Sequence, residues 1–157
     1  MKLYIKQKVF SWNDSFSVYD SMERELFTVK GAMFSFGDRL TIFDRMDREI
    51  YRIEQELFRL RPRYHIVEGE EIQATVVKEF SMFQPYYTVI GPGWEIQGDF
   101  FDHDYRITDA GRLVASVSKQ WFAWGDTYEI DVDDAYDPVA VLAVAIIIDC
   151  VLDKQDD

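Results

Sequence analysis

The stretch Asp137-Pro138-Val139-Ala140-Val141-Leu142-Ala143-Val144-Ala145-Ile146-Ile147-Ile148-Asp149-Cys150-Val151-Leu152 decides the fold. From Val139 to Ile148 it carries no polar side chain on any face, whereas a surface helix is apolar along one stripe only. Asp137 can cap a helix, and Pro138 suits the first helical position. Valine and isoleucine also favour strands, but the length of the run and its three alanines favour a helix. The sequence therefore predicts a buried helix over 137–152, too short to span a membrane, which needs about 20 apolar residues.

The chain of 157 residues is 48% hydrophobic and 16% aromatic, which predicts one domain, 1–157, with a substantial core. Its single cysteine, Cys150, excludes a disulfide within the chain and is typical of a reducing compartment. The first eight residues show no apolar segment of a secretory signal. We therefore expect a cytoplasmic protein.

The net charge of −12 is distributed unevenly. Residues 1–64 hold 12 Lys/Arg and 10 Asp/Glu, whereas residues 65–157 hold 5 and 19. Nucleic-acid binding depends on neutralising phosphates, so a chain this acidic is not expected to bind nucleic acid.

A degenerate repeat of 21–24 residues runs through the sequence, and it is clearest between Phe10–Asp20 and Phe34–Asp44. Six units begin at Phe10, Phe34, Phe58, Phe80, Phe101 and Phe122. Each unit reads as two strands around a turn, and the turn residues are Asn13-Asp14, Gly37-Asp38, Pro62, Gln84-Pro85 and Gly125-Asp126. Alternation of polar and apolar residues predicts strands near 2–9, 15–20, 24–30, 38–44, 48–57, 62–68, 71–79, 85–90, 94–99, 103–109, 112–120 and 126–132.

Twelve short strands suggest a sandwich or a barrel, and the apolar helix decides between the two. Eight strands make a barrel that its own side chains fill, whereas twelve leave a bore that suits a helix about 10–12 Å wide. We therefore predict a closed twelve-stranded antiparallel barrel over 1–132, a linker over 133–136, a central helix over 137–152 and a disordered tail over 153–157. The side chains expected to plug the bore are Val139, Leu142, Ala143, Ile146 and Cys150.

Several motifs resemble the LURP-one-related family, whose bacterial members this chain is most like. They are Trp121–Ile130 with the preceding Val117-Ser118-Lys119, Asp99–Tyr105, Trp94–Gly98 and Tyr4–Phe10. The resemblance covers about residues 1–152. That family is similar in fold to the tubby C-terminal domain and the phospholipid scramblases, which implies a twelve-stranded barrel around a hydrophobic helix.

What the resemblance implies about function is limited, because a shared fold does not fix an activity. Tubby domains bind phosphoinositide headgroups through basic residues, scramblases act on phospholipids, and plant members are linked to defence. Our leading hypothesis is a non-enzymatic binding module that docks on anionic phospholipid, peripheral to the membrane. The alternatives are a structural or stress-related protein that binds another protein and, more weakly, an enzyme or scramblase-like protein acting on lipids.

Arginines supply the candidate ligand site. Arg59, Arg61 and Arg63 are spaced by two, so on a strand they would share one face. Arg48 and Arg52 lie on the preceding predicted strand and would extend the patch. Each basic side chain near an anionic membrane contributes about 1 kcal/mol. The alternative is a solvated face balanced by nearby glutamates.

Other candidate sites are disfavoured, and we expect no catalytic residue, no metal and no cofactor. An apolar setting would keep the Cys150 thiol protonated and inert. Asp102, His103 and Asp104 alternate in direction on a strand, so they favour a polar turn over a metal or catalytic site. Asp131, Asp133, Asp134 and Asp137 suggest a calcium loop, but Tyr136 and Leu142 stand where an EF-hand needs Gly and Glu.

Overall fold

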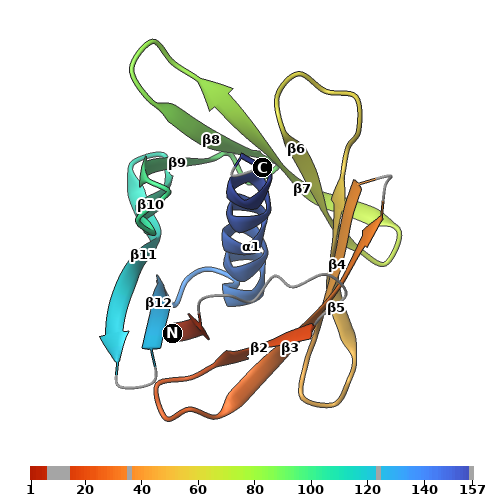
Figure 1. Cartoon of the computed structure of the whole chain (residues 1–157), viewed down its shortest axis with the longest axis vertical. Coiled ribbons are helices and arrows are strands. Elements are labelled where there is room, and N and C mark those ends of the chain that lie inside the picture. The colour runs from red at the N-terminus through yellow and green to blue at the C-terminus, as the bar shows by residue number, and fades with distance from the viewer. Residues whose placement is uncertain (7–14, 35–36, 123–124, 156–157) are drawn as a thin grey trace.

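A computed structural model describes residues 1–6, 15–34, 37–122 and 125–155 of the chain. Twelve strands enclose one helix, α1, which runs through the middle of the molecule (Figure 1). The strands are β1 (Lys2–Lys6), β2 (Ser15–Tyr19), β3 (Glu25–Phe34), β4 (Gly37–Phe43), β5 (Glu49–Gln55), β6 (Arg63–Glu68), β7 (Glu71–Phe80), β8 (Pro85–Ile90), β9 (Trp94–Asp99), β10 (Asp104–Asp109), β11 (Arg112–Phe122) and β12 (Gly125–Val132).

Every strand pairs antiparallel with its neighbour in the chain, and β1 closes the barrel against β12. The closing pair runs in continuous register from Lys2 opposite Asp131 to Lys6 opposite Thr127. On its other side β1 meets β2 through Tyr4 opposite Tyr19. The predicted twelve-stranded antiparallel barrel with a central C-terminal helix is confirmed.

Helix α1 spans Pro138–Gln155 and begins as the sequence predicts. The Asp137 side chain accepts a hydrogen bond from the backbone N–H of Val139 at 2.9 Å, and its carbonyl accepts one from Val141. This is an N-cap, which typically stabilises a helix by about 1 kcal/mol. The helix ends three residues beyond the predicted Leu152, so 153–155 are helical, and 156–157 lie outside the described residues.

The helix fills the barrel with apolar side chains on all its faces. Leu142, Ala143 and Ile146 have no exposed surface, and Val139 and Cys150 are 8% and 5% exposed. Inward-facing strand residues such as Ile53 and Ile66 complete the core. Each large buried aliphatic side chain contributes about 1.5–3 kcal/mol, so the interior is the main source of stability.

The two ends of the barrel differ in their connections. At the turn end, where α1 begins, short turns at 20–24, 44–48, 69–70, 91–93 and 110–111 join the strands. At the loop end, where α1 terminates, the described connections are 56–62, which is the longest described connection between two strands, 81–84 and 100–103. Lys154 near the helix terminus reaches the side chain of Gln55, the last residue of β5, at 2.8 Å.

The internal repeat is visible in two turns 24 residues apart. One oxygen of Asp20 accepts the backbone N–H groups of Met22 and Arg24, and the other binds the Arg24 guanidinium. Asp44 makes the same three contacts with Met46 and Arg48. The predicted relation between the first two repeat units is therefore a relation between two equivalent turns.

Some predicted boundaries differ from the observed ones. The predicted turn at Gly37-Asp38 lies inside β4, and Gly125-Asp126 lies inside β12. The turn Asn13-Asp14 and the end of the predicted strand 2–9 fall outside the described residues. Phe58 has a φ of 62°, a left-handed conformation that an extended strand cannot contain, so the chain leaves the sheet before β6 begins at Arg63.

Candidate functional site

Large apolar side chains are exposed at the loop end. We call them the apolar rim, and its members are Phe58, Leu60, Phe80, Met82, Phe83 and Phe101. Phe58 and Leu60 are fully exposed, and Met82 and Phe83 are about nine-tenths exposed. They come from three separate connections, β5–β6, β7–β8 and β9–β10. Exposed apolar side chains that gather at one end of a molecule are typical of a surface that contacts a partner.

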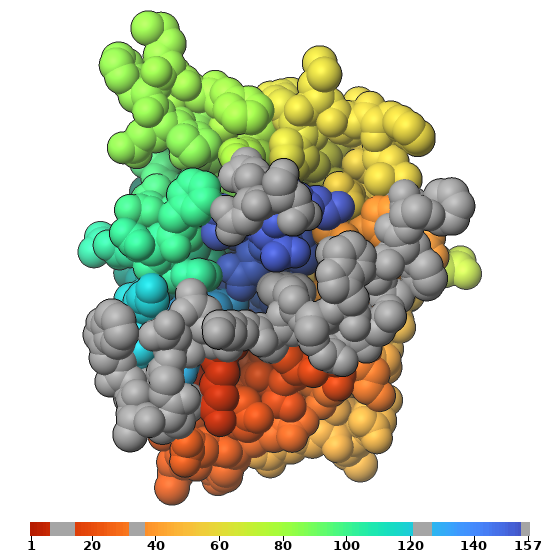
Figure 2. Space-filling model, viewed as in Figure 1, coloured from red at the N-terminus to blue at the C-terminus, as the bar shows by residue number. Residues whose placement is uncertain are grey.

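The segments that carry most of this rim project from the molecule. In Figure 2 the β7–β8 hairpin (green) and the β5–β6 region (yellow) form two lobes with a depression between them. Helix atoms (blue) are visible below that depression. The apolar rim is therefore held away from the body of the barrel on protruding segments.

Arg59 and Arg61 alternate with Phe58 and Leu60 in the β5–β6 loop, and Arg63 opens β6. Arg59 donates to Glu56 at 2.7 Å, Arg61 pairs with Glu79 of β7, and Arg63 lies 3.9 Å from Glu56. The Arg59 contact holds the pKa of Glu56 below its usual value. The three arginines are gathered at one end of the barrel, but the expected common strand face is wrong because Arg59 and Arg61 lie in a loop.

Arg48 and Arg52 do not extend this group. Arg48 binds Asp44 in a turn at the other end of the barrel. Arg52 binds Glu49 and Glu54 and donates to the carbonyl of Gly69, also at the turn end. The seven residues of β5, about 23 Å long, separate the turn at Arg48 from the loop at Arg59. The predicted five-arginine patch is therefore two separate groups.

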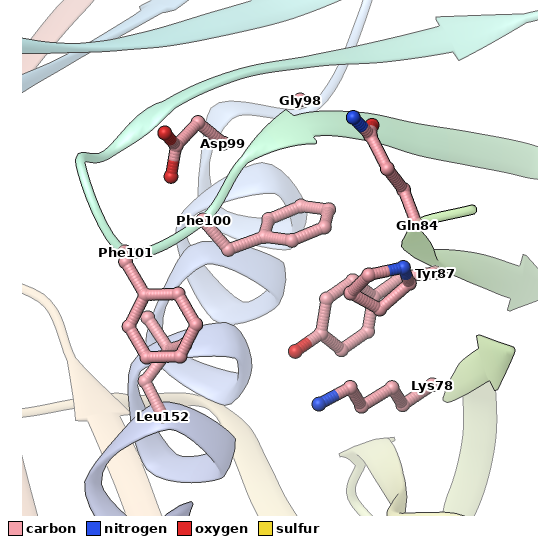
Figure 3. A pocket seen from close by; sticks show the side chains of 9 residues that line it. Lys78, Gln84, Tyr87, Gly98, Asp99, Phe100, Phe101 and Leu152 are labelled. Carbon is pink, nitrogen blue, oxygen red and sulfur yellow. The ribbon is translucent and has the colours of Figure 1, made fainter. Parts of the chain in front are cut away.

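A cavity of about 250 Å³ opens at the loop end between the β7–β8 hairpin, the β9–β10 turn and the helix (Figure 3). We call it the Lys78 pocket, and the residues that matter most in it are Lys78, Gln84, Tyr87, Phe100, Phe101 and Leu152. Phe101 belongs to both the pocket and the apolar rim, so the cavity opens among the exposed apolar side chains.

Lys78 is the unusual residue of this pocket. It follows Ala74 and Val76 on the inward face of β7, and it is only 5% exposed. Within the part of the chain that the structure describes, no carboxylate forms an ion pair with its ammonium group, which lies 5.6 Å from the centroid of the Phe80 ring. Burial lowers the pKa of Lys78. The side chain is largely buried, and its ammonium group lies at the wall of the cavity without a carboxylate partner among the described residues, so this arrangement favours an anion from outside.

A second polar group, buried beside the pocket, surrounds Asp149 on the helix. His103 Nε2 lies 3.0 Å from one carboxylate oxygen, and the Tyr128 hydroxyl donates to the other. The rings of His103 and Tyr128 stack with centroids 4.5 Å apart. His103 lies in a turn as predicted, but it is 8% exposed and points into the barrel.

Three buried polar atoms at this level have no hydrogen-bond partner among the described residues: the hydroxyls of Tyr87 and Tyr105, and Nδ1 of His103. Burial, with a contribution from the nearby Asp149, raises the pKa of both tyrosines. Phe100 lies between their rings, 4.8 Å from Tyr87 and 5.3 Å from Tyr105. Buried polar groups normally find partners, so the loop end of the core is unusually under-satisfied.

Among the described residues, no group of three or more His, Cys, Asp or Glu side chains is arranged to hold a metal ion. The aspartates considered for calcium have separate structural roles. Asp133 accepts from the backbone of Ala135, Asp134 pairs with the amino terminus, and Asp137 caps the helix. Cys150 is buried as predicted, and burial raises the pKa of its thiol.

A second cavity, of about 230 Å³, lies toward the turn end and is lined in part by Tyr51, Trp94 and Ala140. The Tyr51 hydroxyl donates to the Asp137 carboxylate at 2.6 Å. This cavity therefore contains a carboxylate with a hydrogen-bond partner, whereas the Lys78 pocket contains an ammonium group without an ion-pair partner among the described residues.

Comparison with known proteins identifies the family. The model of the LURP-one-related family matches residues 1–149. The chain belongs to the LURP-one-related family. Its motifs and its barrel agree, so the predicted resemblance is confirmed.

One LURP-one-related relative is the uncharacterized protein YxjI of Bacillus subtilis, 38% identical over 157 residues, which cover all of this chain and 97% of that protein. An X-ray structure of a protein from Arabidopsis thaliana superposes with a TM-score of 0.67. It is 14% identical, and the match covers 96% of this chain and 90% of that one, which shows a shared fold. Within the described residues, no helix has the length and apolar character needed to cross a bilayer.

Two features of this LURP-one-related chain escaped sequence reasoning. Lys78 falls in step with Ala74 and Val76 along a predicted strand, so alternation alone would have placed it facing inward. Asp149 is the first polar residue after the apolar run of the helix, one turn before its exposed end. In both cases the signal was a charged residue at a position whose periodicity predicts burial.

Proposed function

We propose that the protein is a binding module that docks on anionic phospholipid surfaces through its loop end and catalyses no reaction. The observation that carries the proposal is the alternation of Phe58, Arg59, Leu60 and Arg61 on one protruding loop, beside the other apolar rim residues. Aromatic side chains favour the boundary between headgroups and acyl chains. Basic side chains are attracted to anionic headgroups by about 1 kcal/mol each.

The charges of the turn end are compatible with this orientation. That end carries acidic side chains in its turns and linker, of which Asp20, Asp44 and Asp133 are paired with arginines and Glu23, Asp47 and Glu70 are exposed. The loop end also has acidic side chains, among them Asp99, Asp102 and Asp104. The barrel is about 20 Å long, whereas exposed charges are screened within about 8 Å at physiological ionic strength. With the loop end on the membrane, the acidic turn end is far enough away to add little repulsion.

The existing ion pairs do not oppose docking. Arg59 and Arg61 are about half exposed and are paired with glutamates at the surface. Exposed pairs of this kind contribute about 0–1 kcal/mol, so an arginine can exchange a carboxylate for a lipid phosphate at small cost. Arginine is well suited to this exchange because its guanidinium binds phosphate through two parallel hydrogen bonds.

A binding role without chemistry agrees with the interior of the barrel. Helix α1 occupies the space in which a wide barrel would hold a ligand. The Cys150 thiol is protonated and buried, so it is a poor nucleophile.

Co-sedimentation with vesicles tests the proposal. The unmodified protein is expected to bind vesicles that contain phosphatidylserine or a phosphoinositide, and to bind less as salt rises. Replacing Arg59, Arg61 and Arg63 by Gln is expected to weaken binding roughly a hundredfold, from about 1 kcal/mol per arginine. Replacing Phe58 and Leu60 by Ser is expected to weaken binding even at low salt.

The matched control replaces Arg24, Arg45 and Arg48, three arginines of the turn end, by Gln. It removes the same charge, so binding close to that of the unmodified protein would assign the effect to the loop end. Surface changes of this kind alter the free energy of unfolding by about 0.5 kcal/mol each, so both proteins should fold. If the unmodified protein ignores anionic vesicles at low salt, the proposal fails, and a protein partner becomes the better explanation of the apolar rim.

A further inference from the structure

The Lys78 pocket has features that docking on a lipid surface does not require. Lys78 lies inside the barrel mouth, 5% exposed, whereas Arg59 and Arg61 already provide exposed positive charge. A lysine used only for surface attraction would keep its ammonium group in water. An ammonium group at the wall of a cavity, on a side chain that is otherwise buried, is better placed to hold one anion.

Tyr87 supplies a second donor beside it. Lys78 and Tyr87 are directly opposite each other in the β7–β8 pair, where Cβ atoms lie about 4.5–5.5 Å apart. The Tyr87 hydroxyl is buried and has no hydrogen-bond partner. Figure 3 shows the ammonium of Lys78 and the hydroxyl of Tyr87 pointing the same way, toward the space beside the helix.

The nearby carboxylates are already bound. Asp99 accepts the backbone N–H of Asp102, and in Figure 3 it is well separated from Lys78. Both oxygens of Asp149 are occupied by His103 and Tyr128. The two donors therefore remain available to a ligand that brings its own acceptor oxygens.

The walls indicate what is attached to that anion. Phe100, Phe101 and Leu152 are apolar, and Phe101, which is 62% exposed, stands where the pocket meets the apolar rim. A cavity of about 250 Å³ is much larger than the roughly 30 Å³ share of one water, and it approaches the lower limit of ligand pockets. It suits an anionic head with the first part of an apolar chain.

We propose that the Lys78 pocket binds the carboxylate of a single-chain amphiphile such as a fatty acid. Lys78 and Tyr87 each donate to one carboxylate oxygen, and the chain leaves the pocket past Phe101. This site is additional to membrane docking and does not depend on it.

Charge and shape separate a carboxylate from phosphate-containing groups. A phosphate monoester carries about −1.5 to −2 charges, which one ammonium does not neutralise. The phosphodiester of a phospholipid is flanked by organic groups on both sides. A carboxylate is the end of its chain, so it can reach Lys78 at the wall of the pocket while the chain extends toward Phe101.

Calorimetric titration of the full chain with decanoate, below the concentration at which it forms micelles, tests the site. One decanoate is expected to bind per chain, and 1-decanol, which has no charge, to bind at least tenfold more weakly. Lys78→Met is expected to weaken decanoate binding at least tenfold, and Tyr87→Phe severalfold. Lys78→Met removes a buried unpaired charge and keeps an unbranched apolar chain, so its melting temperature should not fall.

The matched controls are Tyr105→Phe and Lys30→Met. The Tyr105 hydroxyl is also buried without a partner but does not line the pocket, and Lys30 is exposed on β3. Both variants are expected to bind decanoate like the unmodified protein. In NMR spectra of the unmodified protein, decanoate is expected to raise the pKa of the Lys78 ammonium group, a result that needs no variant.

Three results would overturn the proposal: no decanoate binding, equal binding of decanol, or unchanged binding by a folded Lys78→Met variant. Displacement of decanoate by glycerophosphoglycerol would also overturn it, because the site would then recognise a phosphodiester. None of these results involves vesicles. Failure of this site and failure of membrane docking are therefore observed separately.

Discussion

The same twelve strands form the turn end and the loop end of the barrel. The two ends differ in whether their polar groups are paired. At the turn end, Asp20 and Asp44 each accept two backbone N–H groups and an arginine. At the loop end, the described part of the chain offers no counter-charge to the largely buried Lys78 and no hydrogen-bond partner to the hydroxyls of Tyr87 and Tyr105. Satisfied short turns stabilise a scaffold, whereas unsatisfied groups and exposed apolar loops are available for binding.

The two cavities repeat this contrast at similar size. The turn-end cavity of about 230 Å³ contains the Tyr51–Asp137 hydrogen bond, and the Lys78 pocket of about 250 Å³ contains unpaired donors. Volume alone does not distinguish them. The state of the polar groups in each cavity does, and it favours a ligand at the loop end.

The largest expected effect comes from disrupting the central helix, which fills the core from the turn end to the loop end. Ala143 is fully buried on the central helix, so Ala143→Asp places an unpaired charge in the core. We expect a loss of several kcal/mol in the free energy of unfolding, or a molten protein that binds hydrophobic dye. Urea denaturation followed by circular dichroism measures it. The control, Ala135→Asp in the exposed linker, should change little, and equal effects would contradict the central position of the helix.

A smaller expected effect is a difference in stability between variants at the two ends of the helix. Asp149→Ala removes the acceptor of His103 and Tyr128 and leaves two buried polar groups unpaired, at about 1–3 kcal/mol each. Asp137→Ala removes the helix cap, at about 1 kcal/mol. The midpoint of urea denaturation should therefore fall more for Asp149→Ala than for Asp137→Ala. The reverse order would show that the Asp149 group contributes less than its burial indicates.

The smallest expected effect is a pH dependence shared by two turns. Hydrogen bonds from the backbone N–H groups of Arg24 and Arg48 are the main cause that holds the pKa of Asp20 and Asp44 below the usual 3.8. A lowered folded-state pKa means that each carboxylate contributes its full stabilisation above about 3.8 and loses it as pH falls through the folded value.

Melting temperatures measured from pH 7 down to pH 2 test this dependence. Asp20→Asn and Asp44→Asn should each reduce the loss of stability on the acid side, and by equal amounts, because their contacts are the same. Unequal responses would mean that the two turns are equivalent in geometry but not in energy.

Periodicity predicted the architecture well because the barrel is repetitive. Twelve alternating segments and one uniformly apolar run leave few arrangements that bury every apolar face. Boundaries were less predictable. Nothing in the order Phe58-Arg59-Leu60-Arg61 distinguishes a loop from a strand, since its alternation of apolar and basic residues is that of a strand.

The candidate site was less visible in the sequence because it depends on exceptions. Lysine is rarely buried, so the strand predicted over 71–79 gives no reason by itself to select Lys78 as a site residue. The contact between His103 and Asp149 joins residues 46 positions apart, and no local pattern predicts it. The sequence shows directly which residues are arginines, so these candidates could be named. Which of them lie together depends on the fold, which places Arg48 and Arg59 at opposite ends of the barrel.

Closure of the barrel pairs β1, the first strand of the described chain, with β12, the last. Strand β1 takes its continuous register from β12, and α1, which fills the bore, follows all twelve strands in the chain. During synthesis, at about 5–20 residues per second, the hairpins emerge before the helix that covers their apolar faces. We therefore expect that a fragment lacking β12 and α1 does not fold on its own. We also expect the barrel to close only after the helix has been synthesised.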